Sequence, residues 1–185
     1  MRPRAHQLSE ESALFIPDEE ATRTLGALLG QLLPFPSYLA AEGHLGAGKT
    51  CFAQGLAAGL GVDFPEEVRS PTFAILQRHE GPRPFAHIDL YRLGNADELE
   101  YLGLEELIEG HVSYVEWPSR APELAPPVYL KLTLAASAEG RLAWLQVVGS
   151  DSAQFDSLRV LFYQQAIERG FSLMTASPAT LTLNF

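Results

Sequence analysis

The sequence is poor in cysteine and in positive charge. A single cysteine, Cys51, excludes an internal disulfide and a zinc site built from several cysteines, and it is typical of a reducing compartment. Lysine and arginine together number 13, against 23 aspartate and glutamate residues, which gives a formal net charge of −10. Since such a surface repels a phosphate backbone, the composition argues against a protein that binds nucleic acid unaided.

Long apolar runs are also absent. No stretch approaches the roughly 18 apolar residues that a membrane-spanning helix needs, and the opening residues lack the apolar core of a signal peptide. We therefore expect a cytoplasmic protein with no membrane partner. The length of 185 residues and the hydrophobic fraction of 46% are enough for one sizeable core.

The strongest motif in the sequence is the stretch EGHLGAGKTC, residues 42–51. It satisfies the P-loop pattern G-x-x-x-x-G-K-[ST] through Gly43, Gly48, Lys49 and Thr50. In such a loop, backbone N–H groups surround phosphate oxygens at a helix N-terminus, and glycine allows the close approach. The lysine reaches the outer phosphates, and the threonine hydroxyl is placed to bind Mg²⁺. The motif predicts a nucleotide site.

Hydrophobic patterns place this motif in an α/β fold, because a short apolar strand precedes the loop and a helix follows it. The expected strands cover 12–17, 38–41, 73–79, 84–90, 111–116, 128–135 and 142–148. One expected helix begins after Asp18, and the others cover 49–60, 95–102, 104–108 and 153–169. We interpret the whole as a P-loop NTPase-like three-layer fold with a mixed β-sheet flanked by helices. A P-loop ATPase domain would cover 1–149, with 150–185 as a C-terminal helical extension and tail packed on the same domain.

Two of the expected strands end in an acid. Asp89 follows FAHI, and Glu116 follows VSYV. A strand of a parallel sheet that delivers a carboxylate beside a P-loop is the expected second contact for Mg²⁺. Each acid could instead pair with a nearby arginine. Because both occur in one chain together with a P-loop, we favour a metal-binding role.

Other candidate residues have two interpretations each. The segment 69–73 lies where loops that sense a γ-phosphate occur, but it also fits a plain turn before a strand. Trp117 fits core packing or a position beside a nucleotide. His44, His79 and His87 fit solvated or buried residues better than metal ligands. The sequence shows no obvious built-in arginine finger.

Several segments together resemble one family. GHLGAGKT followed closely by QGLAAGLG, then VRSPTF, HIDLYRL and VEWP, occur in the order and at about the spacing of the TsaE family, also called YjeE. The early segment PDEEATRTLG is similar to that family's opening helix. The resemblance covers roughly residues 12–148, and it implies an ATPase of bacterial tRNA threonylcarbamoyladenosine synthesis.

The resemblance also implies roles for residues that the motif alone does not assign. It places Thr22 against the nucleotide base, Trp117 and Arg141 near the nucleotide, and Asp89 and Glu116 as active-site carboxylates. With the P-loop, the predicted nucleotide-binding residues are Thr22, Gly43, His44, Leu45, Gly46, Ala47, Gly48, Lys49, Thr50, Cys51, Ser70, Thr72, Trp117 and Arg141. The predicted catalytic residues are Lys49, Asp89 and Glu116, and the predicted Mg²⁺ ligands are Thr50, Asp89 and Glu116.

The activity that the resemblance implies is hydrolysis of ATP with Mg²⁺, as a partner of the TsaD and TsaB proteins. Those proteins transfer a threonylcarbamoyl group to adenosine 37 of tRNA, so contact with tRNA would be indirect, in agreement with the acidic composition. Two alternatives stay open: a small-molecule P-loop kinase and a nucleotide-gated scaffold with little hydrolysis. A signalling GTPase is disfavoured, because the sequence contains no N-K-x-D motif.

Overall fold

The computed structural model describes residues 8–94, 103–150 and 152–178. Its strands are β1 (Ser12–Ile16), β2 (Ser37–Glu42), β3 (Leu76–His79), β4 (Phe85–Asp89), β5 (Val112–Glu116), β6 (Tyr129–Ser137), β7 (Gly140–Val148) and β8 (Ser172–Thr175). Its α-helices are α1 (Glu19–Leu32), α2 (Lys49–Leu60), α4 (Leu104–Gly110) and α5 (Ala153–Glu168). None of these described helices has the length and apolarity needed to cross a membrane. The helix expected over 95–102 lies outside the described residues.

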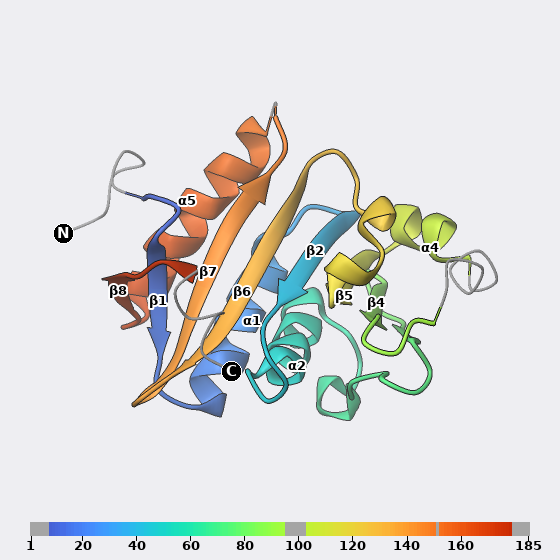
Figure 1. Ribbon diagram of the computed structural model, residues 1–185, viewed down its shortest axis with the longest axis horizontal. Helices are drawn as coiled ribbons and strands as arrows, with labels where there is room; N and C mark the ends of the chain where they lie inside the picture. The colour runs from blue at the N-terminus through green and yellow to red at the C-terminus, as the bar shows by residue number, and fades with distance from the viewer. Residues whose placement is uncertain (1–7, 95–102, 151, 179–185) are drawn as a thin grey trace.

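The described strands form one mixed sheet in the order β3-β4-β5-β2-β6-β7-β1-β8 (Figure 1). The neighbours β4, β5, β2 and β6 run parallel, whereas the strands at both sides pair antiparallel. Because the carboxyl ends of parallel strands meet at one edge of a sheet, the P-loop after β2 lies beside the last residues of β4 and β5. The sheet therefore places the P-loop beside the two strand-end acids, Asp89 and Glu116.

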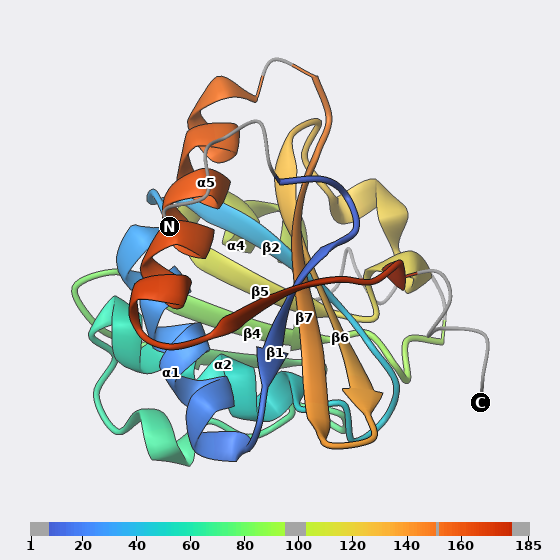
Figure 2. The same ribbon diagram turned by 90° about the vertical axis from the view of Figure 1, so that its left-hand side faces the viewer.

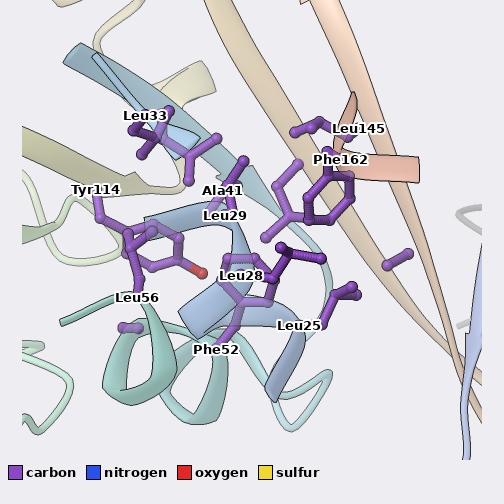
Figure 3. Close-up of a cluster of buried hydrophobic side chains, with 14 of the residues drawn as sticks. Leu25, Leu28, Leu29, Leu33, Ala41, Phe52, Leu56, Tyr114, Leu145 and Phe162 are labelled. Atoms are coloured by element: carbon purple, nitrogen blue, oxygen red, sulfur yellow. The ribbon is translucent and has the colours of Figure 1, made fainter. Parts of the chain in front are cut away.

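Helices cover both faces of the sheet. Leu39 and Ala41 of β2 face the larger core, which α1, α2 and α5 close on one side of the sheet (Figure 2). Figure 3 shows leucines of α1 packed against Phe52 of α2 and Phe162 of α5 in this core. The intervening β2 residues point to the opposite face, where α4 and the 3-10 helices η3 (Pro118–Arg120) and η4 (Pro122–Leu124) pack. The predicted three-layer fold with a mixed sheet is confirmed.

Helix α1 packs backbone to backbone against α2. Its N-cap is Asp18, whose carboxylate accepts a hydrogen bond from a first-turn backbone N–H at 2.8 Å. A Cβ added at Gly55 of α2 would lie 2.0 Å from the Arg23 carbonyl oxygen, and one at Gly59 would lie 2.2 Å from that of Ala27. Only glycine permits this contact. At the start of the two helices, Cys51 Sγ lies 3.2 Å from the Glu19 carbonyl oxygen, so the first turn of α1 lies next to the first turn of α2.

The start of β3 differs from the expectation. The apolar pattern predicts a strand from residue 73, but β3 begins at Leu76. The preceding residues form a turn instead, in which Ile75 has a φ of 64° and its N–H donates to the Pro71 carbonyl oxygen at 2.6 Å. The Ile75 carbonyl oxygen still accepts from the Asp89 N–H at 2.8 Å, but the turn and the positive φ take the residues before it out of the ladder.

The segment after β7 contributes to the larger core. Helix α5 places Phe162 and Ala166 in the cluster shared with α1 and α2, and β8 adds an edge strand beside β1. The Tyr163 hydroxyl donates to the Ser12 carbonyl oxygen at 2.7 Å and accepts from the Leu145 N–H at 3.1 Å. It therefore links β1 to β7 just beyond the last paired residues of their ladder. The division of the chain at 149/150 stays a prediction.

Replacing this hydroxyl should destabilise the fold. We expect Tyr163→Phe to lower the free energy of unfolding by about 1–3 kcal/mol, because the buried Ser12 carbonyl and Leu145 N–H both lose their partner. Denaturant unfolding followed by circular dichroism measures the change. Tyr91→Phe, at a residue that is 42% exposed, is the matched control and should change stability by no more than about 0.5 kcal/mol. Equal losses in the two variants would contradict the bridging role.

Candidate functional site

A cavity of about 700 Å³ opens where the P-loop meets the ends of β4 and β5. The P-loop joins β2 to α2 and forms one wall. Asp89 and Glu116, which are register partners in the parallel pair of β4 and β5, also line the cavity. The sequence-predicted residues that line the cavity are Leu45, Gly46, Gly48, Lys49, Thr50, Cys51, Ser70, Thr72, Asp89, Glu116, Trp117 and Arg141.

The P-loop backbone favours glycine at both glycine positions of the motif and at Gly46 between them. Gly43, Gly46 and Gly48 have φ angles of 147°, 80° and 102°, which residues with a side chain rarely adopt. A Cβ added at Gly43 would also lie 2.5 Å from the Leu134 carbonyl oxygen on β6. Gly48 is the N-cap of α2, so backbone donors at the start of that helix border the cavity.

Lys49 is held in place within this loop. Its side chain is 5% exposed, and its amino group donates to the carbonyl oxygens of Gly43 at 2.8 Å and His44 at 3.0 Å. Nζ also lies 3.8 Å from Glu116 Oε2 and 4.6 Å from the centre of the Trp117 ring. Burial lowers the pKa of Lys49, and the carboxylate of Glu116 opposes that shift. The side chain thus brings a positive charge to the cavity wall, where a phosphate group would benefit from it.

Asp89 binds the loop 70–73 to the end of β4. Its Oδ2 accepts from Ser70 Oγ at 2.6 Å and from Thr72 Oγ1 at 2.8 Å, and its Oδ1 accepts from the Tyr91 N–H at 3.0 Å. The carboxylate is 2% exposed. Consequently, this loop, which the sequence allows as a phosphate sensor or as a plain turn, is hydrogen-bonded directly to a carboxylate of the cavity.

Glu116 is buried at the end of β5 and makes contacts through both oxygens. Oε1 lies 2.8 Å from His87 Nε2, and Oε2 lies 3.8 Å from Lys49 Nζ. Tyr114, on the same face of β5, donates its hydroxyl to the Lys49 carbonyl oxygen at 3.0 Å. The strand therefore fixes the first residue of α2 and places a carboxylate beside its side chain.

The donor set at the cavity fits Mg²⁺. Thr50 supplies a hydroxyl, Asp89 and Glu116 supply carboxylates, and all three residues line the same cavity; oxygen atoms are the ligands that Mg²⁺ prefers. Within the ranges that the structure describes, no three His, Cys, Asp or Glu side chains are grouped so as to hold a metal ion.

Arginines line the cavity, although the sequence shows no obvious arginine finger. The Arg92 guanidinium lies 4.1 Å above the ring of Phe73, a side chain that is 87% exposed. Arg141 of β7 lies against the P-loop, since a Cβ added at Gly48 would be 3.0 Å from its Nε. Arg23 of α1 is a third such residue, and it forms an ion pair with Glu19 at 3.4 Å.

Some predicted nucleotide-binding residues do not line this cavity. Thr22 is fully buried, and its hydroxyl donates to the Asp18 carbonyl oxygen at 2.8 Å. Gly43 and His44 border a smaller cavity of about 100 Å³, and Ala47 is buried in the core. Their contribution to nucleotide binding stays a prediction, although the carbonyl groups of Gly43 and His44 already position Lys49.

The structure also brings residues to the site that the sequence reasoning did not assign. They are Glu19, Arg23, Gln54, Tyr91 and Arg92 at the cavity and His87 beside Glu116. A signal existed for His87, because residues two apart in a strand share a face and His87 precedes Asp89 by two. For Glu19, Arg23 and Gln54 no such signal existed, because their position at the cavity depends on how α1 packs on α2.

Comparisons with known proteins match the chain to one family. The family described as threonylcarbamoyl adenosine biosynthesis protein TsaE matches residues 16–143. The tRNA threonylcarbamoyladenosine biosynthesis protein TsaE of Synechocystis is 45% identical over 116 residues, which are 60% of this chain and 72% of that protein. The protein of the same name from Nostoc is 39% identical over 140 residues, or 72% of this chain and 83% of that protein.

A solved structure supports the same relationship. The Bacillus subtilis protein YdiB superimposes with a TM-score of 0.67 and 25% sequence identity, covering 85% of this chain and 98% of that one. The part of this chain that matches the family, residues 16–143, contains the P-loop, the loop 70–73 and the ends of β4 and β5. The resemblance that the sequence motifs indicate is therefore confirmed, and the chain belongs to the TsaE family of tRNA threonylcarbamoyladenosine biosynthesis proteins.

Proposed function

We propose that this protein is a cytoplasmic, Mg²⁺-dependent ATPase that supports threonylcarbamoyl transfer to adenosine 37 of tRNA, acting with TsaD and TsaB. One observation carries the hydrolase assignment: a single cavity collects Lys49, Thr50, Asp89 and Glu116 from the P-loop and two parallel strands. Hydrolysis needs acids that hold Mg²⁺ and orient water in addition to a phosphate-binding loop. The family membership supports the link to tRNA modification.

Each residue has a proposed role that follows from its chemistry. Lys49 contributes a buried positive charge for the outer phosphates, and Mg²⁺, when bound with the nucleotide, would neutralise further phosphate charge. Thr50 and Glu116 would hold the metal through oxygen atoms. Asp89 would join them and report the state of the site to the loop 70–73, because its Oδ2 accepts hydrogen bonds from two hydroxyls of that loop.

Indirect contact with tRNA is consistent with the charge of the chain. The formal net charge of −10 opposes direct binding of a polyanion. In this proposal the partner proteins hold the tRNA, and the ATPase acts on their complex between turnovers. ATP is proposed over GTP because the sequence contains no N-K-x-D guanine-recognition motif.

The decisive experiment measures ATP hydrolysis by the protein alone, then with TsaD and TsaB, and then with tRNA added. We expect the partners to stimulate the rate, since the proposed reaction serves their catalytic cycle. The same three mixtures with GTP test nucleotide choice.

The other outcomes of this experiment separate the alternatives. ATP binding without hydrolysis in any mixture would favour a nucleotide-gated scaffold. Hydrolysis that the partners leave unchanged, together with phosphate transfer to a small acceptor, would favour a kinase. Either result would contradict the proposal.

A further inference from the structure

We propose that His87 is a positioning residue that holds Glu116 in the orientation needed to bind Mg²⁺. The inference rests on the proposed function, since it assigns a metal-binding role to Glu116. It concerns a residue that would not touch the nucleotide or the reacting atoms. The evidence for the inference is the geometry and burial of the His87 and Glu116 side chains, together with the hydrogen-bonding capacity of the imidazole ring.

The His87 and Glu116 side chains form an enclosed pair. His87 is 0% exposed and Glu116 is 3% exposed, and 2.8 Å separates His87 Nε2 from Glu116 Oε1. An acceptor facing another acceptor at this distance would be repelled, so Nε2 must carry the proton and donate it to the carboxylate. The histidine thereby occupies one oxygen of Glu116 and leaves the other beside the cavity.

The second nitrogen of the ring supports this assignment of the proton. His87 Nδ1 is buried and has no hydrogen-bond partner among the described residues. A proton on Nδ1 would create a buried N–H without an acceptor, which costs more than leaving a lone pair without a donor. The geometry therefore favours the ring form that carries its proton on Nε2 and donates it to Glu116.

Packing fixes the direction of that donor. The ring of His87 stacks beside Phe85, with 6.2 Å between ring centres, and meets Tyr114 edge-on at 5.4 Å. Both aromatic residues are fully buried, so the imidazole has little freedom to turn. A rigid donor on β4 can thus hold the longer and more flexible side chain of Glu116 on β5.

Without His87, the carboxylate has a competing partner. Glu116 Oε2 already lies 3.8 Å from Lys49 Nζ, and a carboxylate released from the histidine could move closer to this cation. Such a shift would take a ligand from Mg²⁺. In metal sites, loss of a residue that orients a ligand typically weakens metal affinity about 10–100-fold.

The test compares His87→Ala and His87→Gln with the wild-type protein. Affinity for a fluorescent ADP analogue is measured in EDTA and then across a Mg²⁺ titration, and thermal unfolding is recorded for each variant. We expect His87→Ala to need about 10–100-fold more Mg²⁺ for the metal-dependent change in nucleotide affinity, while the affinity in EDTA changes little. His87→Gln keeps an N–H donor and should recover much of the loss.

His79→Ala is the matched control. His79 lies on the neighbouring strand β3 and also stacks with Phe85, with 5.8 Å between the two ring centres. Because it makes no contact with Glu116 among the interactions that the structure describes, its replacement should leave the Mg²⁺ requirement unchanged. If His87→Ala does not fold, His87→Leu fills the space of the ring without supplying a donor and takes its place.

The outcomes separate this inference from the proposed function. An unchanged Mg²⁺ requirement in His87→Ala, or an equal loss of affinity in EDTA and in Mg²⁺, would overturn the positioning role while leaving the nucleotide site in place. Failure of the wild-type protein to bind the ADP analogue under either condition would instead overturn the proposed function. A selective Mg²⁺ defect that glutamine relieves would support the inference.

Discussion

Replacing Lys49 with alanine should abolish most ATP turnover by the protein together with TsaD, TsaB and tRNA. We expect a loss of about 100-fold or more, the size seen when one electrostatic group is removed from a catalytic site. Lys49 is 5% exposed and lies 3.8 Å from Glu116. Its loss removes the buried positive charge of the P-loop and leaves that carboxylate without its cation. Steady-state phosphate release measures the rate.

Lys131→Ala provides the matched control for this prediction. Lys131 is the other lysine of the sequence and lies on β6, opposite Gln146 of β7, outside the residues that line the cavity. Turnover should stay close to that of the wild-type protein. If Lys49→Ala also left turnover unchanged, the assignment of the P-loop as the site of hydrolysis would be wrong.

Structure that depends on nearby residues could be predicted from the sequence. Helix α2 has the predicted limits, Lys49–Leu60, because Gly48 and Gly61 adopt positive φ angles of 102° and 82° at its two ends. Asp18 caps α1 as predicted, since a side-chain acceptor before an apolar helical pattern is a local signal. The P-loop could be located for the same reason, because all of the residues that its pattern specifies lie within 43–50.

Contacts between distant segments could be predicted only in part. The sequence places carboxylates at the ends of two strands, but their meeting depends on the parallel pairing that puts Asp89 opposite Glu116. It did not reveal that the hydroxyls of Ser70 and Thr72 both donate to Asp89. Nor did it reveal that His87 donates to Glu116, because the partner of a buried histidine is set by which strand lies beside it.

The C-terminal segment shows the same limit. Its helical spacing predicts α5, since the apolar residues recur at intervals that match one helix face. The pattern gives no information about which part of the sheet that face covers. The Tyr163 hydroxyl, which links Ser12 to Leu145, therefore became apparent only from the arrangement of the strands.

Replacing Glu116 with glutamine should separate turnover from nucleotide affinity. Glutamine keeps the size of the side chain but removes the negative charge that would bind Mg²⁺. We expect turnover in the presence of the partners and tRNA to fall about 100-fold or more. Affinity for ADP in EDTA should not fall. Turnover is measured by phosphate release, and metal-free affinity is measured by titration with a fluorescent ADP analogue.

The direction of the affinity change identifies the role of Glu116. Its Oε2 lies 3.8 Å from Lys49 Nζ, so the carboxylate both attracts the lysine and repels a polyphosphate. Neutralising it should therefore leave metal-free affinity unchanged or raise it, even as turnover collapses. A purely structural acid would behave differently, because its loss would reduce turnover and affinity together. Glu123→Gln, at an exposed position of η4, should alter neither turnover nor metal-free affinity. The opposite effects on these two quantities would then be specific to the carboxylate beside Lys49.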